Sequence, residues 1–164
     1  EKVATAALEF TGEFRPLVDE KGFAYWTKVI SELRSGFAKL RDVESLVQLL
    51  FVEEVTLEDE AAAFLAEGDH REKFLQIAER WADLVTKAEF AQDADSLTEE
   101  EFNQCFAALK RDYKKEKTLL FKTIRICVTG SLSGYELKVL VPFIERSLLA
   151  NRARVMIANV RGFV

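Results

Sequence analysis

LLFKTIRICVTGSLSGYEL, residues 119–137, places a single arginine, Arg125, inside an apolar segment of helical character. Thr129-Gly130 predicts the end of that helix, because glycine readily adopts the left-handed conformation that follows a helix C-terminus. The pattern Ser133-x-x-Glu136 has the form of a capping box and predicts a new helix start after a short polar turn. A helix with one planar cation, followed by a tight turn, suits the presentation of hydrogen-bond donors to an anion or a base edge.

The composition around this stretch indicates an all-α protein. The chain has 164 residues, of which 49% are hydrophobic, so one domain or two small ones can bury a core. Two prolines and seven glycines are too few for a β-sandwich with many turns. Alanine, leucine, glutamate, lysine and arginine are abundant, and these residues favour helices.

Cysteine and histidine are too sparse for a disulfide framework, a metal site or a nucleophile–base pair. Cys105 and Cys127 are the two cysteines, far apart in sequence, and His70 is the single histidine. We expect Cys105 to belong to the core and assign no role to His70. There is no secretory signal and no apolar run long enough to span a bilayer, so we expect a cytoplasmic monomer without membrane contact. The chain does not begin with methionine, which suggests a piece of a longer protein.

The charge is divided unevenly along the chain. The net charge is −5, but residues 110–164 hold twelve of the 23 basic residues and four of the 28 acidic ones, a net charge of +8. The remainder therefore carries −13. This asymmetry predicts that a polyanion would meet only the last part. The alternative is that these charges merely solvate helix faces.

Apolar spacing of three and four residues predicts a series of amphipathic helices. They run from Phe23 to Leu40, from Asp42 to Phe51, from Thr56 to Gly68, from Asp69 to Val85, and from Thr98 to Tyr113. Thr98 begins a capping box, and Thr56 is also expected to cap its helix. Pro142 predicts a break near Val141, hence two short helices between residues 138 and 149. Residues 152–164 have uneven periodicity and receive no assignment.

With these elements placed, residues 119–130 resemble the Leu-Phe-x-Pro-Leu-Arg-x-Ala-Leu-Thr-Gly signature of bacterial glutamyl-tRNA synthetases. The order of helices from about Phe14 to Arg152 is similar too. The resemblance implies the C-terminal anticodon-binding region, an α-helical cage of two subdomains, here residues 1–67 and 68–164. It also implies that the partner is tRNA(Glu) and that the chain does not bind DNA. The family's two nucleotide-binding motifs are absent, so ATP, Mg²⁺ and catalysis would belong to a separate N-terminal domain, and this chain would itself be non-catalytic.

The resemblance also implies which residues meet RNA. Arg125 matches the signature arginine at the anticodon, and Gly134 and Leu137 lie in the turn that packs on the bases. Tyr135 and Thr123 each replace a proline of the family, and the tyrosine adds an aromatic face. The remaining RNA-binding candidates are Lys114, Lys115, Lys122 and Arg34.

One departure from the family bears on which tRNA is read. The arginine that discriminates tRNA(Glu) from tRNA(Gln) aligns with Gly36, with Arg34 two residues earlier. This substitution admits tRNA(Gln) as a second partner. From another class of function, a helical protein-interaction module without RNA contact remains the alternative, and the net negative charge supports it.

Overall fold

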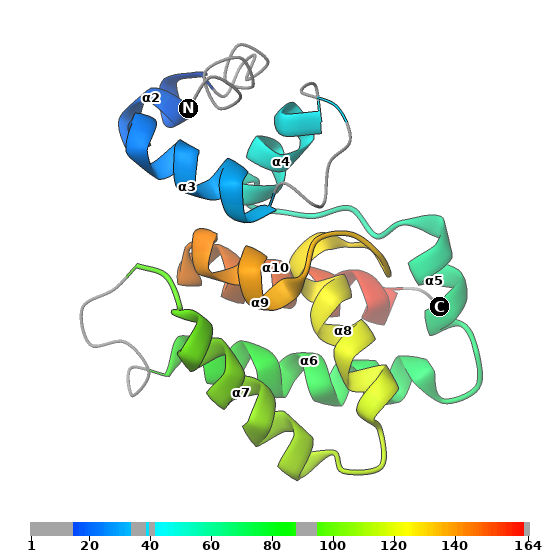
Figure 1. Cartoon of the computed structure of the whole chain (residues 1–164). Coiled ribbons are helices and arrows are strands. Elements are labelled where there is room, and N and C mark those ends of the chain that lie inside the picture. The colour runs from blue at the N-terminus through cyan, green and yellow to red at the C-terminus, as the bar shows by residue number, and fades with distance from the viewer. Residues whose placement is uncertain (1–14, 34–38, 40–41, 88–94, 163–164) are drawn as a thin grey trace. The chain divides into compact units, whose positions relative to one another are not determined.

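A computed structural model describes residues 15–33, 39, 42–87 and 95–162 of the chain (Figure 1). These residues form helices and turns, with an isolated β-bridge between Ser96 and Glu145 and no strand among them. The predicted all-α class is therefore confirmed. The chain divides into two compact units, Glu1–Val52 and Glu53–Val164, which are described separately. The subdomain boundary predicted after residue 67 differs from this division and stays a prediction.

The first unit consists of three described helices: α2 (Arg15–Lys21), α3 (Phe23–Leu33) and α4 (Asp42–Phe51). The described positions of the expected apolar stripes are buried except Phe51, which is half-buried and contacts Trp26 at 5.9 Å between ring centroids. The carboxylate of Asp42 accepts a hydrogen bond from the backbone N–H of Lys39 at the start of α4. Arg34 and Gly36, on which tRNA discrimination was predicted to depend, and the end of that helix up to Leu40 lie outside the described residues.

The second unit is built around α6 (His70–Thr86), the helix with the clearest apolar stripe in the sequence. Around α6 pack α5 (Asp59–Leu65), α7 (Glu99–Asp112), α8 (Lys117–Thr129) and α10 (Arg146–Gly162). The stripe residues of α6 are buried as predicted, and Trp81 meets Phe102 of α7 edge to face. Burial of large aromatic and aliphatic side chains along one helix provides most of the hydrophobic stabilisation of such a unit.

The predicted break at Pro142 is present, but the second helix is not short, because it continues for 17 residues. Helix α9 (Leu137–Leu140) is followed by a single 3₁₀ turn, Val141–Phe143, and then by α10. The segment from residue 152, which the sequence left unassigned, continues α10 to Gly162 and packs on α6 and α8. Within the described part of the chain, no helix has the length and apolar character needed to cross a membrane.

Two predicted helix starts are wrong by two or three residues. Helix α5 has Glu58 as its N-cap instead of Thr56, because the Glu58 N–H donates to the Gly130 carbonyl and holds the preceding segment extended. Helix α9 has Glu136 as its N-cap instead of Ser133, whose N–H donates to the Ser131 hydroxyl within a local turn. The capping box at Thr98 and Glu101 is confirmed.

Candidate nucleic-acid interface

Arg125 lies on α8 at the edge of the core. Its neighbours on the helix are buried, and the arginine itself is 7% exposed. Its Nη1 donates a hydrogen bond of 2.9 Å to the Tyr135 carbonyl, and its guanidinium carbon lies 5.3 Å from the centroid of the Phe121 ring. Desolvation lowers the pKa of the guanidinium below its ordinary value. The sequence thus fixes a cation between an aromatic ring and a turn.

The turn beside Arg125 follows from the end of α8. Gly130 has φ +76° and ends the helix in the left-handed conformation, as predicted. The Thr129 hydroxyl donates to the Arg125 carbonyl at 2.8 Å and accepts from the Ser131 N–H, which tightens the first step of the turn. Gly134 has φ +124°, and a Cβ built there would lie 3.8 Å from the arginine Nη1. The backbone of residues 129–135 therefore folds back towards the guanidinium.

Some of the predicted RNA-binding residues lie close together in the structure, and the side chain of another, Leu137, is buried. Arg125, Gly134 and Tyr135 are neighbours, and Tyr135 is half-buried. Leu137 is 1% exposed, so its side chain belongs to the core and only its backbone remains for contact with a ligand. The sequence could not show this, because the burial of Leu137 depends on helices that lie far away along the chain.

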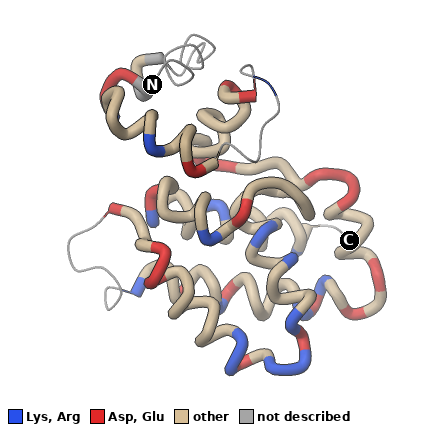
Figure 2. The backbone as a smooth tube through the Cα atoms, viewed as in Figure 1, with Lys and Arg blue, Asp and Glu red and all other residues tan. Residues whose placement is uncertain are grey.

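The lysines gather where α7 connects to α8, and Figure 2 shows Lys and Arg concentrated at this connection. Lys114 and Lys115 are exposed, whereas Lys122 is half-buried with its Nζ 4.2 Å from the centroid of the Phe64 ring. All three line a groove of about 530 Å³, which we call the lysine groove. Its other lining residues are Phe64, Glu67, His70, Glu116, Lys117, Thr118 and Leu119.

Glu67 and Glu116 are the acids in the lining of the lysine groove, and Glu116, like the nearby Asp112, is paired with a cation outside it. Asp112 accepts from Arg80 at 3.0 Å, and Glu116 pairs with Lys73 at 2.7 Å. Among the residues that the structure describes, no salt bridge joins an acid to Lys114 or Lys115. The positive charge of these lysines is therefore directed to solvent, where it attracts anions through long-range electrostatics.

The single histidine packs against Phe64, and both cysteines are buried. His70 Nδ1 lies 2.9 Å from the Phe64 carbonyl oxygen, and its ring lies 4.4 Å from that of Phe64. Cys105 is buried, as predicted, and burial raises the pKa of its thiol to about 11. Cys127 is also buried, and desolvation raises its pKa further. Neither thiol is activated as a nucleophile.

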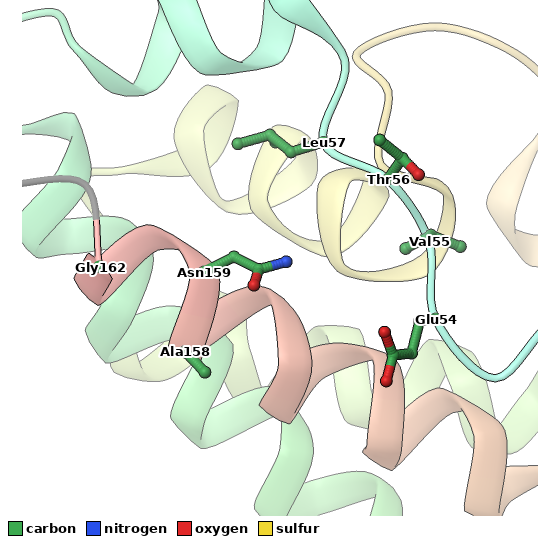
Figure 3. Close-up of a pocket in the computed structure, with 7 residues that line it drawn as sticks. All are labelled: Glu54, Val55, Thr56, Leu57, Ala158, Asn159 and Gly162. Carbon is green, nitrogen blue, oxygen red and sulfur yellow. The ribbon is translucent and has the colours of Figure 1, made fainter.

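A second groove lies between the segment 54–57 and the last turns of α10 (Figure 3). It measures about 510 Å³, and Glu54 is the charged residue in its lining. Asn159, Ala158 and Gly162 contribute the helical side near the C-terminus of α10, where the helix dipole is negative. A carboxylate beside a negative helix end repels a polyanion, so this groove is unsuited to nucleic acid.

Sequence reasoning missed two residues of this unit. Phe121 stands in the opening stretch but received no role, although it is 40% exposed and lies one helical turn from Arg125. The spacing of four residues on one helix was the available signal. Arg152 is completely buried and donates from Nη1 to the Val128 carbonyl at 3.0 Å, near the end of α8. No local signal distinguishes it from an exposed arginine.

Comparison with known proteins finds sequence similarity to glutamate–tRNA ligases. No protein-family model matches the sequence. The glutamate–tRNA ligase of Bdellovibrio bacteriovorus is 33% identical over 107 residues, which cover 63% of this chain and 21% of the ligase. The glutamate–tRNA ligase of a Sulfurihydrogenibium species is 24% identical over 122 residues, 74% of this chain and 24% of that ligase. The chain thus spans about a quarter or less of these curated relatives, and it is similar to a region of each.

Proposed function

We propose that this chain binds tRNA and reads the anticodon of tRNA(Glu) as the anticodon-binding region of a glutamate–tRNA ligase. The observation that carries the proposal is the placement of Arg125, held between Phe121 and the turn at Tyr135 on the same helix as Lys122 of the lysine groove. Similarity to two glutamate–tRNA ligases supports the tRNA partner. Adenylation, with ATP and Mg²⁺, is assigned to a catalytic domain outside this chain.

Arg125 and the lysines have different tasks in this proposal. Anticodon bases are single-stranded, so their edges are open to hydrogen bonds and their faces to stacking. A guanidinium offers a planar array of donors that stays protonated, and such an array can distinguish one base from another. Lys114, Lys115 and Lys122 contact phosphates, which positions the RNA without reading its sequence. The turn at Gly134 and Tyr135 lies beside the bases.

The proposal predicts that Arg125→Ala weakens cognate binding more than noncognate binding. A lost base contact costs about 1–3 kcal/mol in cognate affinity and narrows the preference for tRNA(Glu) over a noncognate tRNA. Filter binding of tRNA(Glu), tRNA(Gln) and an unrelated tRNA measures this. Arg154→Ala, which removes an exposed arginine of α10, is the control for loss of one charge and should leave the preference unchanged.

The lysines are tested in the same assay over a range of salt concentrations. The double substitution Lys114→Ala and Lys115→Ala should weaken the binding of all tRNAs alike. It should also reduce the magnitude of the slope of log affinity against log salt concentration by about 1–2. If Arg125→Ala weakens the binding of every tRNA equally, Arg125 does not read bases. If the unmodified chain binds no tRNA at low salt but captures a protein, the helical protein-interaction module is the better description.

A further inference from the structure

Phe121 is exposed in a helix that is otherwise largely buried. It is 40% exposed, and Phe23 in the first unit is the other large apolar side chain found exposed among the described residues. The neighbouring positions Leu119, Leu120 and Ile124 of α8 are at most 5% exposed. The core therefore accounts for the apolar character of α8 but not for an aromatic ring at position 121.

The ring of Phe121 is one of two adjacent aromatic rings that have a cation at each end. Its centroid lies 6.1 Å from that of Phe106, with the two planes at 84°. Lys110 Nζ lies 4.5 Å from the Phe106 centroid, and the guanidinium of Arg125 approaches the Phe121 ring. Edge-to-face packing and cation–π contacts hold such rings in place. Phe121 is thus a fixed ring with an accessible part, and not a freely moving side chain.

The charge around Phe121 indicates what covers it. Next to it on α8 is Lys122, which lines the lysine groove together with Lys114 and Lys115. Lysine is depleted from the cores of protein–protein interfaces, and a docking surface for a protein requires a wider apolar patch than one ring. An exposed aromatic ring on the helix that also carries a lysine of a cationic groove instead suits single-stranded nucleic acid, whose bases stack while its phosphates follow the positive charge.

We propose that Phe121 is a stacking platform for one unpaired RNA base, with the phosphates next to that base directed to the lysine groove. This inference rests on the proposed function and extends it, because it assigns a base contact to a residue outside the predicted set. In this arrangement Arg125 contacts both the Phe121 ring, on which the base stacks, and the turn at Tyr135. Stacking discriminates little between bases, so Phe121 adds affinity and Arg125 adds selectivity.

The test uses the full chain and an RNA hairpin with the sequence of the anticodon arm of tRNA(Glu), carrying 2-aminopurine at one loop position at a time. We expect Phe121→Ala and Phe121→Leu to weaken binding about 5- to 100-fold and Phe121→Trp to restore most of the affinity. At one loop position, the fluorescence of 2-aminopurine should be quenched by the unmodified chain and by Phe121→Trp, but not by Phe121→Leu. A hairpin with an abasic loop should bind equally to the unmodified chain and to the three Phe121 variants, because its phosphate contacts remain.

Four results would overturn the inference, and the last of them would overturn the proposed function as well. Wild-type affinity of Phe121→Leu would show that apolar bulk suffices, as at a protein-docking surface. Equal losses on the intact and the abasic hairpin would show that the ring only supports the fold, and melting temperatures of the variants check this directly. Unchanged binding by Phe121→Ala, together with a reduced preference for tRNA(Glu) in Arg125→Ala, would remove the stacking role and leave the proposed function standing. If the folded unmodified chain does not bind the intact hairpin, both proposals fail together.

Discussion

Arg125 and Arg152 show how the same residue type serves two purposes in one unit. Each donates from Nη1 to a main-chain carbonyl, Arg152 to Val128 in the last turn of α8 and Arg125 to Tyr135 in the segment that follows α8. Arg152 is completely buried, and desolvation lowers its pKa to about 10, whereas Arg125 keeps part of its surface at the rim. A cation near a helix C-terminus also interacts favourably with the helix dipole. Arg152 is therefore a structural support of the helix on which Arg125 is presented.

Thr123 is a residue whose replacement should stabilise the protein. Its hydroxyl is buried on α8 and has no hydrogen-bond partner among the described residues. Because an unsatisfied buried polar group costs free energy, Thr123→Val, which has nearly the same shape, should raise the free energy of unfolding by about 1 kcal/mol. Urea denaturation followed by circular dichroism measures the change.

Thr129→Val is the matched control for that substitution. The Thr129 hydroxyl donates to the Arg125 carbonyl and accepts from the Ser131 N–H, so its loss should lower the free energy of unfolding by about 0.5–1.5 kcal/mol. Destabilisation by Thr123→Val of the same size as by Thr129→Val would show that the hydroxyl of Thr123 is satisfied after all.

At the scale of elements, the end of α8 is set by contact with a segment distant in sequence. Gly130 adopts φ +76°, and the Glu58 N–H donates to its carbonyl at 3.0 Å. A Cβ at position 130 would lie 1.9 Å from the Thr56 carbonyl oxygen. Two separate features therefore require glycine at this position: the left-handed backbone conformation, and the close approach of the segment before α5, which leaves no room for a Cβ.

Gly130→Ala should therefore be strongly destabilising. Strain in the left-handed conformation together with overpacking against Thr56 should lower the free energy of unfolding by about 2–5 kcal/mol. Gly68→Ala is the control, because Gly68 has φ +51° but no atom lies within 4 Å of the place that a Cβ would occupy, so that only strain of about 1–2 kcal/mol applies. Chemical denaturation of both variants separates the two contributions. Equal losses would show that the clash with Thr56 relaxes at little cost.

The elements that the sequence predicted well are those determined by local signals. The stripe of α6, the capping box at Thr98 and the end of α8 at Gly130 follow from periodicity and from backbone preferences of neighbouring residues. The N-caps of α5 and α9 were misplaced because backbone hydrogen bonds to other segments compete with side-chain caps. In the candidate site, Arg125 and its turn could be predicted, but the burial of Leu137 could not, since it depends on tertiary packing.

For the molecule as a whole, the candidate RNA-binding residues gather in one unit, although that unit is not basic over its whole length. The unit Glu53–Val164 contains α5 to α10, its own core around α6, and all predicted RNA-binding residues except Arg34. Basic residues are concentrated in its second half. The predicted contribution of Arg34 and Gly36 to discrimination between tRNAs belongs to the first unit.

The second unit should fold by itself. Because α6 buries its apolar stripe against α7, α8 and α10 within this unit, a protein consisting of residues 53–164 should show a helical spectrum and a single cooperative thermal transition. Circular dichroism and calorimetry measure both properties. A broad transition without cooperativity would show that the unit depends on residues 1–52 for its core.

The hydrogen bond from Arg125 to the Tyr135 carbonyl has a consequence for the entropy of ligand binding. A free arginine side chain has about 1.5–2 kcal/mol of rotamer freedom to lose when it is ordered. In this protein that freedom is already reduced on folding, with one of the five guanidinium N–H donors engaged by the turn. A ligand therefore meets donors that are aligned in advance, and the entropic cost of ordering them lowers the stability of the fold and not the affinity of the complex.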